Sequence, residues 1–269
     1  MIDFSKLSEC RYDAFKVDDS GYYTLDAASA KTTLDIFKKC RPEAAVYEFT
    51  HKDFWIVKRQ DIYETLLAGC ALLRAQKYAE DTGRAYDEER CITKVKEVLH
   101  WLENTDFYTA PASTVYHDAY RGGLCDHSIR VAIHVVKLYY SDVMPATRRT
   151  CTLADVVLTA LIHDWCKIGL YESYMKNVKN DATGQWEQVE AFKKREDFVA
   201  PFGHGASSLY LAMKFFKLSQ EEALAIRWHM GEYNVADNEM NELHYANENY
   251  PLVFLLQFAD RLSITNYQV

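Results

Sequence analysis

Segments with helical periodicity dominate this chain and restrict the folds open to it. Apolar residues recur at three- and four-residue spacing over residues 61–81 and 86–104, as in amphipathic helices. Four further apolar segments follow, at residues 122–140, 152–167, 219–231 and 250–263. Only 10 glycines and 5 prolines occur in 269 residues, so long flexible linkers are not expected. We therefore predict a mainly α fold.

Cap signals mark where two of these helices begin. Thr152 with Asp155, and Ser219 with Glu222, have the spacing of a capping box, in which each side chain accepts from the other residue's backbone N–H. Gly231 supplies a stop signal for the second helix. The sequence therefore predicts helix starts at residues 152 and 219.

A projecting β-hairpin is predicted between these two helices. Polar and apolar residues alternate on both sides of a "DATGQ" turn at residues 181–185. Basic residues in this segment are candidates for guiding an anionic substrate: Lys176, Lys179, Lys193, Lys194 and Arg195. The same segment holds as many acidic residues, so a solvated hairpin is the default interpretation.

The N-terminal part has weaker signals. Residues 27–40 look helical and residues 44–57 look strand-like, ahead of the two amphipathic helices. An alanine-proline pair within residues 105–114 discourages helix and suggests a soft boundary near residue 106. We predict a mixed, mostly helical N-terminal region of unknown role at 1–105 and a second domain at 106–269.

Composition restricts the partners and the location. The net charge of -8, from 39 acidic and 31 basic residues, argues against duplex nucleic acid, although a short strand in a local basic groove stays open. Seven scattered cysteines without a C-x-x-C pair predict reduced thiols in a cytoplasmic protein. The longest apolar stretch, "LLAGCALL", is too short to span a bilayer, and the first fifteen residues lack an export signal. We expect no membrane partner.

Ionisable residues interrupt the apolar segments. The six candidates are His127, His163, Asp164, His204, His229 and Asp260. A carboxylate in an apolar segment is costly unless a cation meets it, and beside histidine that cation is commonly a metal ion. Several helices that converge inward-facing histidines and carboxylates are how bundle metal sites are built.

The donor types specify the chemistry further. Four imidazoles and two carboxylates suffice for two divalent ions, with both oxygens of Asp164 free to bridge them. Such a pair lowers the pKa of a shared water and holds phosphoryl oxygens. A nitrogen-rich donor set favours Mn, Fe, Co, Ni or Zn over Ca.

The order of these residues resembles the HD superfamily of metal-dependent phosphohydrolases, in its longer form with two extra histidines. "HDWCKIG" resembles the family's His-Asp-x-x-Lys-x-Gly, and "GHG" and "FADRLS" fall where the later ligands belong. "APASTVYHDAYRGGLCDHS" is similar to the first-ligand segment in HD domains of certain bacterial 3′-to-5′ exoribonucleases. The resemblance covers roughly residues 106–269 and implies an HD-type helical bundle.

This resemblance implies roles for individual residues. One metal ion would be held by His127, His163, Asp164 and Asp260. A second would be held by His204 and His229 with Asp164 shared; in a one-metal form these two histidines would instead bind phosphate. One or two ions of Mn, Fe, Co, Ni, Zn or Mg are expected.

The implied activity is hydrolysis of a phosphoester of a nucleotide or cyclic nucleotide by metal-activated water, with Asp164 and Lys167 as catalytic residues. Lys167 and Arg130, each about one helical turn beyond a ligand, would contact the substrate phosphate. His117 lies in a loop and either contacts substrate or caps a turn.

Two other functions stay open. A 3′-to-5′ exonuclease acting on single strands is favoured by the first-ligand segment and opposed by the acidic balance, and residues 1–105 do not resemble the nucleic-acid-binding module of those enzymes. The other alternative is a regulatory module that binds a nucleotide without hydrolysing it, although nothing in the sequence supports a loss of activity, because all six ligand positions and Lys167 are present. His134 is expected to be a packed core residue, and His51, His100 and His244 surface or satisfied core residues. The oligomeric state is not predicted.

Overall fold

The structure is a computed structural model that describes residues 16–17, 22–26, 49–51, 54–141, 149–198, 200 and 202–264. For the strands before residue 59 only the backbone is described. The helix predicted at 27–40 lies outside the described residues. Within the described part of the chain, no helix is both long and apolar enough to cross a membrane.

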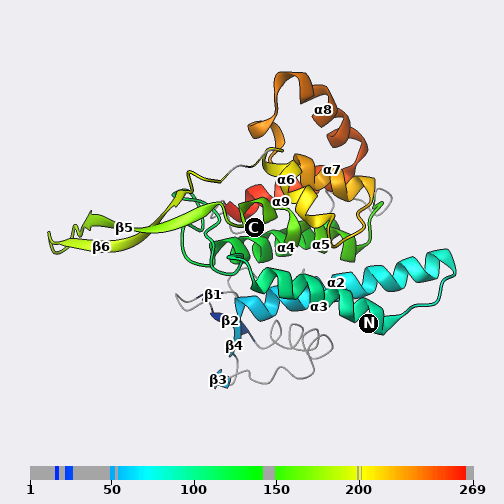
Figure 1. The fold of residues 1–269 in the computed structure, drawn as a ribbon, viewed down its shortest axis with the longest axis horizontal. Helices are drawn as coiled ribbons and strands as arrows, with labels where there is room; N and C mark the ends of the chain where they lie inside the picture. The colour runs from blue at the N-terminus through cyan, green and yellow to red at the C-terminus, as the bar shows by residue number, and fades with distance from the viewer. Residues whose placement is uncertain are drawn as a thin grey trace.

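The described chain is mainly helical with a projecting hairpin, as predicted (Figure 1). Its α-helices are α2 (Arg59–Thr82), α3 (Glu88–Glu103), α4 (Gly123–Tyr140), α5 (Leu153–Ile162), α6 (His204–Ala212), α7 (Gln220–Trp228), α8 (Met240–Asn249) and α9 (Pro251–Ile264). Short 3-10 turns are η4 (Trp165–Lys167), η5 (Gly231–Asn234) and η6 (Asp237–Glu239). The strands are β1 (Lys16–Val17), β2 (Tyr22–Asp26), β3 (Phe49–His51), β4 (Phe54–Lys58), β5 (Tyr171–Lys179) and β6 (Trp186–Lys194).

The helices pack around one hydrophobic core. Helices α4, α5 and α9 lie in the middle, with α2 and α3 on one side and α6 and α7 on the other (Figure 1). The fully buried Trp165 donates its indole N–H to the Tyr63 hydroxyl at 2.9 Å, and that hydroxyl donates to the Leu161 carbonyl at 2.8 Å. Tyr63 belongs to α2, so residues on both sides of the boundary predicted near residue 106 contribute to the same core.

Both predicted capping boxes are present. Thr152 and Asp155 begin α5, and Ser219 and Glu222 begin α7, each with the reciprocal side-chain-to-backbone bonds. The helix predicted over 152–167, however, ends at Ile162. Adjacent side chains on a continuous helix point about 100° apart. Because the chain leaves helical geometry at Asp164, the adjacent side chains of His163 and Asp164 can point in the same direction.

The hairpin forms where it was predicted. Strands β5 and β6 pair antiparallel with Tyr171 opposite Lys194 and Lys179 opposite Trp186. Nearly all of its side chains face solvent, and Figure 1 shows it extending away from the helices. Midway along β6, Glu190 makes an ion pair with Arg121 at 2.7 Å.

Two elements differ from the sequence expectation. Helix α6 begins at His204, a residue expected in a loop, and α8 was not predicted. Both are short, and α8 is polar with only Leu243 and Ala246 buried, so neither has a long apolar stripe. At the N-terminus the strand-like segment contains β3 and β4, which belong to a four-stranded sheet in the order β1-β2-β4-β3.

Candidate metal centre

The first candidate ligand is placed by a tight turn before α4. A Cβ atom on Gly123 would lie 2.0 Å from the Asp118 carbonyl oxygen, so only glycine permits this approach of the loop to the helix start. Gly122 has φ +88°, in the region that favours glycine. One turn later His127 points into the core and is almost completely buried.

The structure brings all six predicted side chains together around Asp164, from α4, α6, α9 and the C-terminal ends of α5 and α7. Asp164 Oδ2 lies 3.3 Å from His127 Nε2 and 3.5 Å from His163 Nε2. Asp164 Oδ1 lies 2.7 Å from His204 Nε2 and 3.4 Å from His229 Nε2. Each carboxylate oxygen therefore faces its own pair of imidazoles.

The second carboxylate, Asp260, lies nearest the two imidazoles on the Oδ2 side of Asp164, and one of its oxygens also lies within 4.8 Å of a ring nitrogen of His229. Asp260 Oδ1 is 3.1 Å from His127 Nε2 and 3.9 Å from His163 Nε2. The Oδ2 side of the centre therefore has two imidazoles and two carboxylates, whereas the Oδ1 side has two imidazoles and one shared carboxylate.

Hydrogen bonds fix the orientation of two of these rings. His163 Nδ1 donates to the Ala160 carbonyl at 2.6 Å, and His229 Nδ1 donates to the Ile226 carbonyl at 2.8 Å. A carbonyl oxygen only accepts, so the proton of each neutral ring is on Nδ1 and Nε2 presents its lone pair. This is the arrangement of histidines that bind metal ions.

His127 is oriented in the same way by a side chain. Its Nδ1 lies 3.1 Å from the Ser263 hydroxyl, which itself donates to the Asp260 carbonyl at 2.7 Å. Because the Ser263 hydroxyl donates its only proton to the Asp260 carbonyl, its oxygen accepts a hydrogen bond from His127 Nδ1.

Three buried ring nitrogens lack a hydrogen-bond partner, namely the Nε2 atoms of His127, His163 and His229. They lie near the carboxylate oxygens, where lone pairs and negative charge repel unless a cation or a proton offsets them. Buried groups of this centre, including His127, His163 and Asp164, lie close enough together to hold a metal ion. The donor set fits one or two divalent ions.

Lys167 supplies positive charge to the centre. Its Nζ lies 2.7 Å from Asp164 Oδ2, and its side chain is only 9% exposed, so it does not extend into solvent. Burial alone would raise the pKa of Asp164, but Lys167 and His163 hold that pKa well below its usual value. Burial likewise opposes ionisation of Asp260, yet the neighbouring His127 and His163 lower its pKa. Both carboxylates are ionised at neutral pH.

His204 is held differently from the other three histidines. Its Nε2 makes a hydrogen bond with Asp164 Oδ1, and its Nδ1 lies 3.4 Å from Cys166 Sγ. The side chains of His204 and Asp260 are 20% and 14% exposed, which makes them the solvent-facing members of the six. A Cβ atom on Gly205 would lie 2.1 Å from the Arg227 carbonyl, so this glycine lets α6 begin directly against α7.

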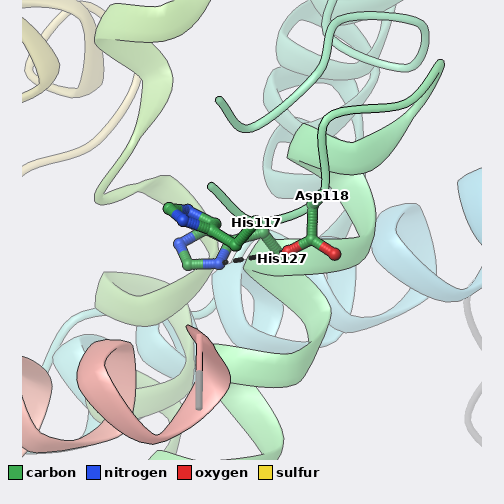
Figure 2. Close-up of side chains that lie close together, drawn as sticks. All are labelled: His117, Asp118 and His127. Atoms are coloured by element: carbon green, nitrogen blue, oxygen red, sulfur yellow. Dashed lines mark ion pairs between the residues drawn. The ribbon is translucent and has the colours of Figure 1, made fainter. Parts of the chain in front are cut away.

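The loop before α4 adds His117 and Asp118, which Figure 2 shows close to His127. The ring centroids of His117 and His127 are 5.2 Å apart, and Asp118 Oδ2 is 3.9 Å from His127 Nδ1. Buried His117 Nε2 has no hydrogen-bond partner, and burial, with His127 and Lys167, lowers the pKa of His117 to about 4. Arg130 makes an ion pair with Asp118.

Three residues of the centre were missed from the sequence: Asp118, Cys166 and Ser263. Each had a local signal, since Asp118 completes a second His-Asp pair, Cys166 lies between Asp164 and Lys167, and Ser263 follows Asp260 by three residues. His100 and His244 lie outside the centre and are exposed. His134 is buried in α4, as expected, and burial lowers its pKa to about 4.

Searches against protein-family models, curated protein sequences and solved structures found no match for this chain.

Proposed function

We propose that this chain is a metal-dependent phosphohydrolase of the HD type that hydrolyses a phosphoester of a nucleotide or cyclic nucleotide. The observation that carries this proposal is the position of Asp164, whose two oxygens face separate pairs of imidazoles. The buried, unpartnered Nε2 atoms of His127, His163 and His229 support a cation at the centre rather than a satisfied polar cluster.

The proposed ligands fall into two sets: His127, His163, Asp164 and Asp260 for one ion, and His204, His229 and the shared Asp164 for the other. The nitrogen-rich donors favour Mn, Fe, Co, Ni or Zn over Ca. Divalent ions in such sites supply Lewis acidity and lower the pKa of water.

The chain's own residues then bind and orient the substrate. Lys167, buried against Asp164 Oδ2, is placed to meet negative charge on a phosphoryl group at the centre. His117 has an unpartnered Nε2 beside His127, which supports a direct contact with substrate. Arg130 is paired with Asp118, so it acts on phosphate only if it exchanges that partner.

A small substrate is favoured over a strand of nucleic acid. In the hairpin Lys193 pairs with Glu172 at 2.9 Å, and next to it Arg195 pairs with Asp197 at 2.9 Å. These two cations have acidic partners, which weakens the case for a basic groove on the hairpin. We also infer a reducing, cytoplasmic location from the seven scattered cysteines, which include no C-x-x-C pair.

The test is metal analysis followed by an activity screen. Protein purified without chelator should carry one to two divalent ions per chain and hydrolyse some member of a panel of mononucleotides, cyclic dinucleotides and short RNA. Chelation should abolish that hydrolysis and lower the melting temperature, and adding a transition metal should restore both. His244→Ala, an exposed histidine outside the centre, is the matched control. Absence of metal together with no metal-induced rise in melting temperature would disprove the proposal.

A further inference from the structure

The four histidines of the candidate metal centre differ in what holds Nδ1. His163 and His229 each cap the C-terminal end of a helix, where the carbonyl three residues earlier lies within reach of the ring. His204 is instead the first residue of α6 and has no such helical carbonyl before it. Its Nδ1 contacts the thiol of Cys166, at 3.4 Å.

This thiol is held in place by the helix that carries His204. The backbone N–H of Cys166 donates to the Ser208 hydroxyl at 3.0 Å, and Ser208 lies one turn after His204 on α6. Cys166 and Ser208 are both buried. The hydrogen bond therefore fixes η4 against α6 and sets the position of the sulfur relative to the His204 ring.

The hydrogen bonds of His204 define one tautomer. Nε2 lies 2.7 Å from Asp164 Oδ1 in a hydrogen bond, and an ionised carboxylate only accepts. The proton of the neutral ring is therefore on Nε2, and Nδ1 accepts from the Cys166 S–H. His127, His163 and His229 have the opposite tautomer, with the proton on Nδ1.

Binding of a metal ion through His204 Nε2 requires the other tautomer. The Nε2 proton then leaves to solvent, Nδ1 gains a proton, and the ring stays neutral. A thiol suits this exchange because the S–H donates to Nδ1 in the first state and the sulfur accepts from Nδ1–H in the second. A backbone carbonyl can serve only the second state.

We propose that Cys166 is a positioning residue for the ion on the Oδ1 side, orienting His204 and supporting both of its tautomers. The inference rests on the proposed metal centre. Cys166 is not assigned as a ligand: although Asp164, Cys166 and His204 are close enough to surround an ion, the sulfur contacts Nδ1 and the carboxylate contacts Nε2. The two nitrogens of an imidazole point in diverging directions, so the thiol supports the ring from behind.

The experiment compares Cys166→Ala and Cys166→Ser with wild type and with Cys70→Ala, a buried thiol in α2 outside the centre. Metal is first removed from each protein with a chelator, and the metal-free protein is then titrated with Co²⁺ by calorimetry. Cys166→Ala should weaken the second ion about 10- to 100-fold and leave the first unchanged, as expected for loss of a hydrogen bond behind a ligand. Cys166→Ser should recover most of the affinity, because a hydroxyl also donates and accepts. Cys70→Ala should bind both ions like wild type.

A second measurement uses the wild-type protein and does not depend on any variant folding. Long-range proton–nitrogen NMR distinguishes imidazole tautomers. The metal-free protein should show His204 protonated on Nε2, and the Zn²⁺-bound protein should show it protonated on Nδ1. The Co²⁺ spectrum should lack a thiolate-to-cobalt charge-transfer band.

Each contrary result has a distinct meaning. The inference would be overturned if Cys166→Ala bound the second ion as tightly as wild type. It would also be overturned if His204 were already protonated on Nδ1 in the metal-free protein. Either result would leave the metal centre intact. A thiolate charge-transfer band would overturn the inference by making Cys166 a ligand. Wild-type protein that binds no ion would instead remove the metal centre itself.

Discussion

The two sides of Asp164 are built in different ways. On the Oδ2 side, His127 and His163 come from α4 and the end of α5, two buried helices that pack against each other, and Asp260 adds a second carboxylate. On the Oδ1 side, His204 begins the short helix α6, is partly exposed, and contacts the Cys166 thiol through Nδ1. For the proposed metal centre, this difference predicts that the ion on the Oδ2 side binds to groups already in place and that the two ions bind with unequal affinities.

The largest effect is expected for Asp164→Ala, which removes the carboxylate that joins the two sides. Binding of both ions and hydrolysis should be lost. Because Lys167 would keep a buried charge without its partner, the free energy of unfolding should also fall by about 3–5 kcal/mol. Metal analysis and denaturant unfolding of the metal-free protein measure the two effects separately.

The double variant Asp164→Ala/Lys167→Met is the control for the stability effect. It removes both charges, so it should be more stable than Asp164→Ala alone. If the two variants unfold at the same denaturant concentration, the buried pair does not explain the loss. If Asp164→Ala retains wild-type metal content, Asp164 is not a bridge.

Single ligand substitutions on opposite sides sharpen the comparison. His163→Ala should weaken mainly the binding of the ion on the Oδ2 side. His204→Ala should leave the binding of that ion unchanged and weaken mainly the binding of the second ion. Calorimetric titration with one metal distinguishes the two losses by stoichiometry. The same loss in both variants would mean that the sides form one inseparable site.

Lys167→Met tests whether the Oδ2 side contributes positive charge to catalysis. The metal ions should stay bound, and the rate should fall about 100-fold, by analogy with the loss of one preorganised electrostatic donor. Initial rates on whichever phosphoester the wild type hydrolyses, with metal content measured in parallel, check this. A nearly unchanged rate would withdraw the catalytic role and leave the ligand assignment standing.

Local sequence patterns predicted parts of both sides of the centre. The capping boxes of Thr152 and Ser219 are local patterns and were predicted together with their helices. The ligand residues were candidates because ionisable side chains interrupt apolar segments, and the fold places them together. Sequence periodicity did not show that α5 ends at Ile162, because apolar residues continue past that point.

Contacts between distant residues were the least predictable. Cys166 and His204 are 38 positions apart, and Ser263 and His127 are 136 apart, so no local pattern relates them. Helix α6 was missed for a related reason: its short sequence has little intrinsic signal, and packing against α7 and η4 stabilises it.

The smallest effect is expected for Ser263→Ala, which tests how firmly the Oδ2 side is preorganised. The hydroxyl accepts from His127 Nδ1, so its loss should weaken the first ion, but Asp118 Oδ2 lies only 3.9 Å from the same nitrogen and can take over as acceptor. The affinity should therefore fall about 10-fold, at the low end for groups behind a ligand. Adding Asp118→Asn weakens that substitute acceptor and should increase the loss. If Ser263→Ala binds the first ion as tightly as wild type even with Asp118→Asn present, packing of α4 alone orients His127, and the Oδ2 side is more rigid than its hydrogen bonds indicate.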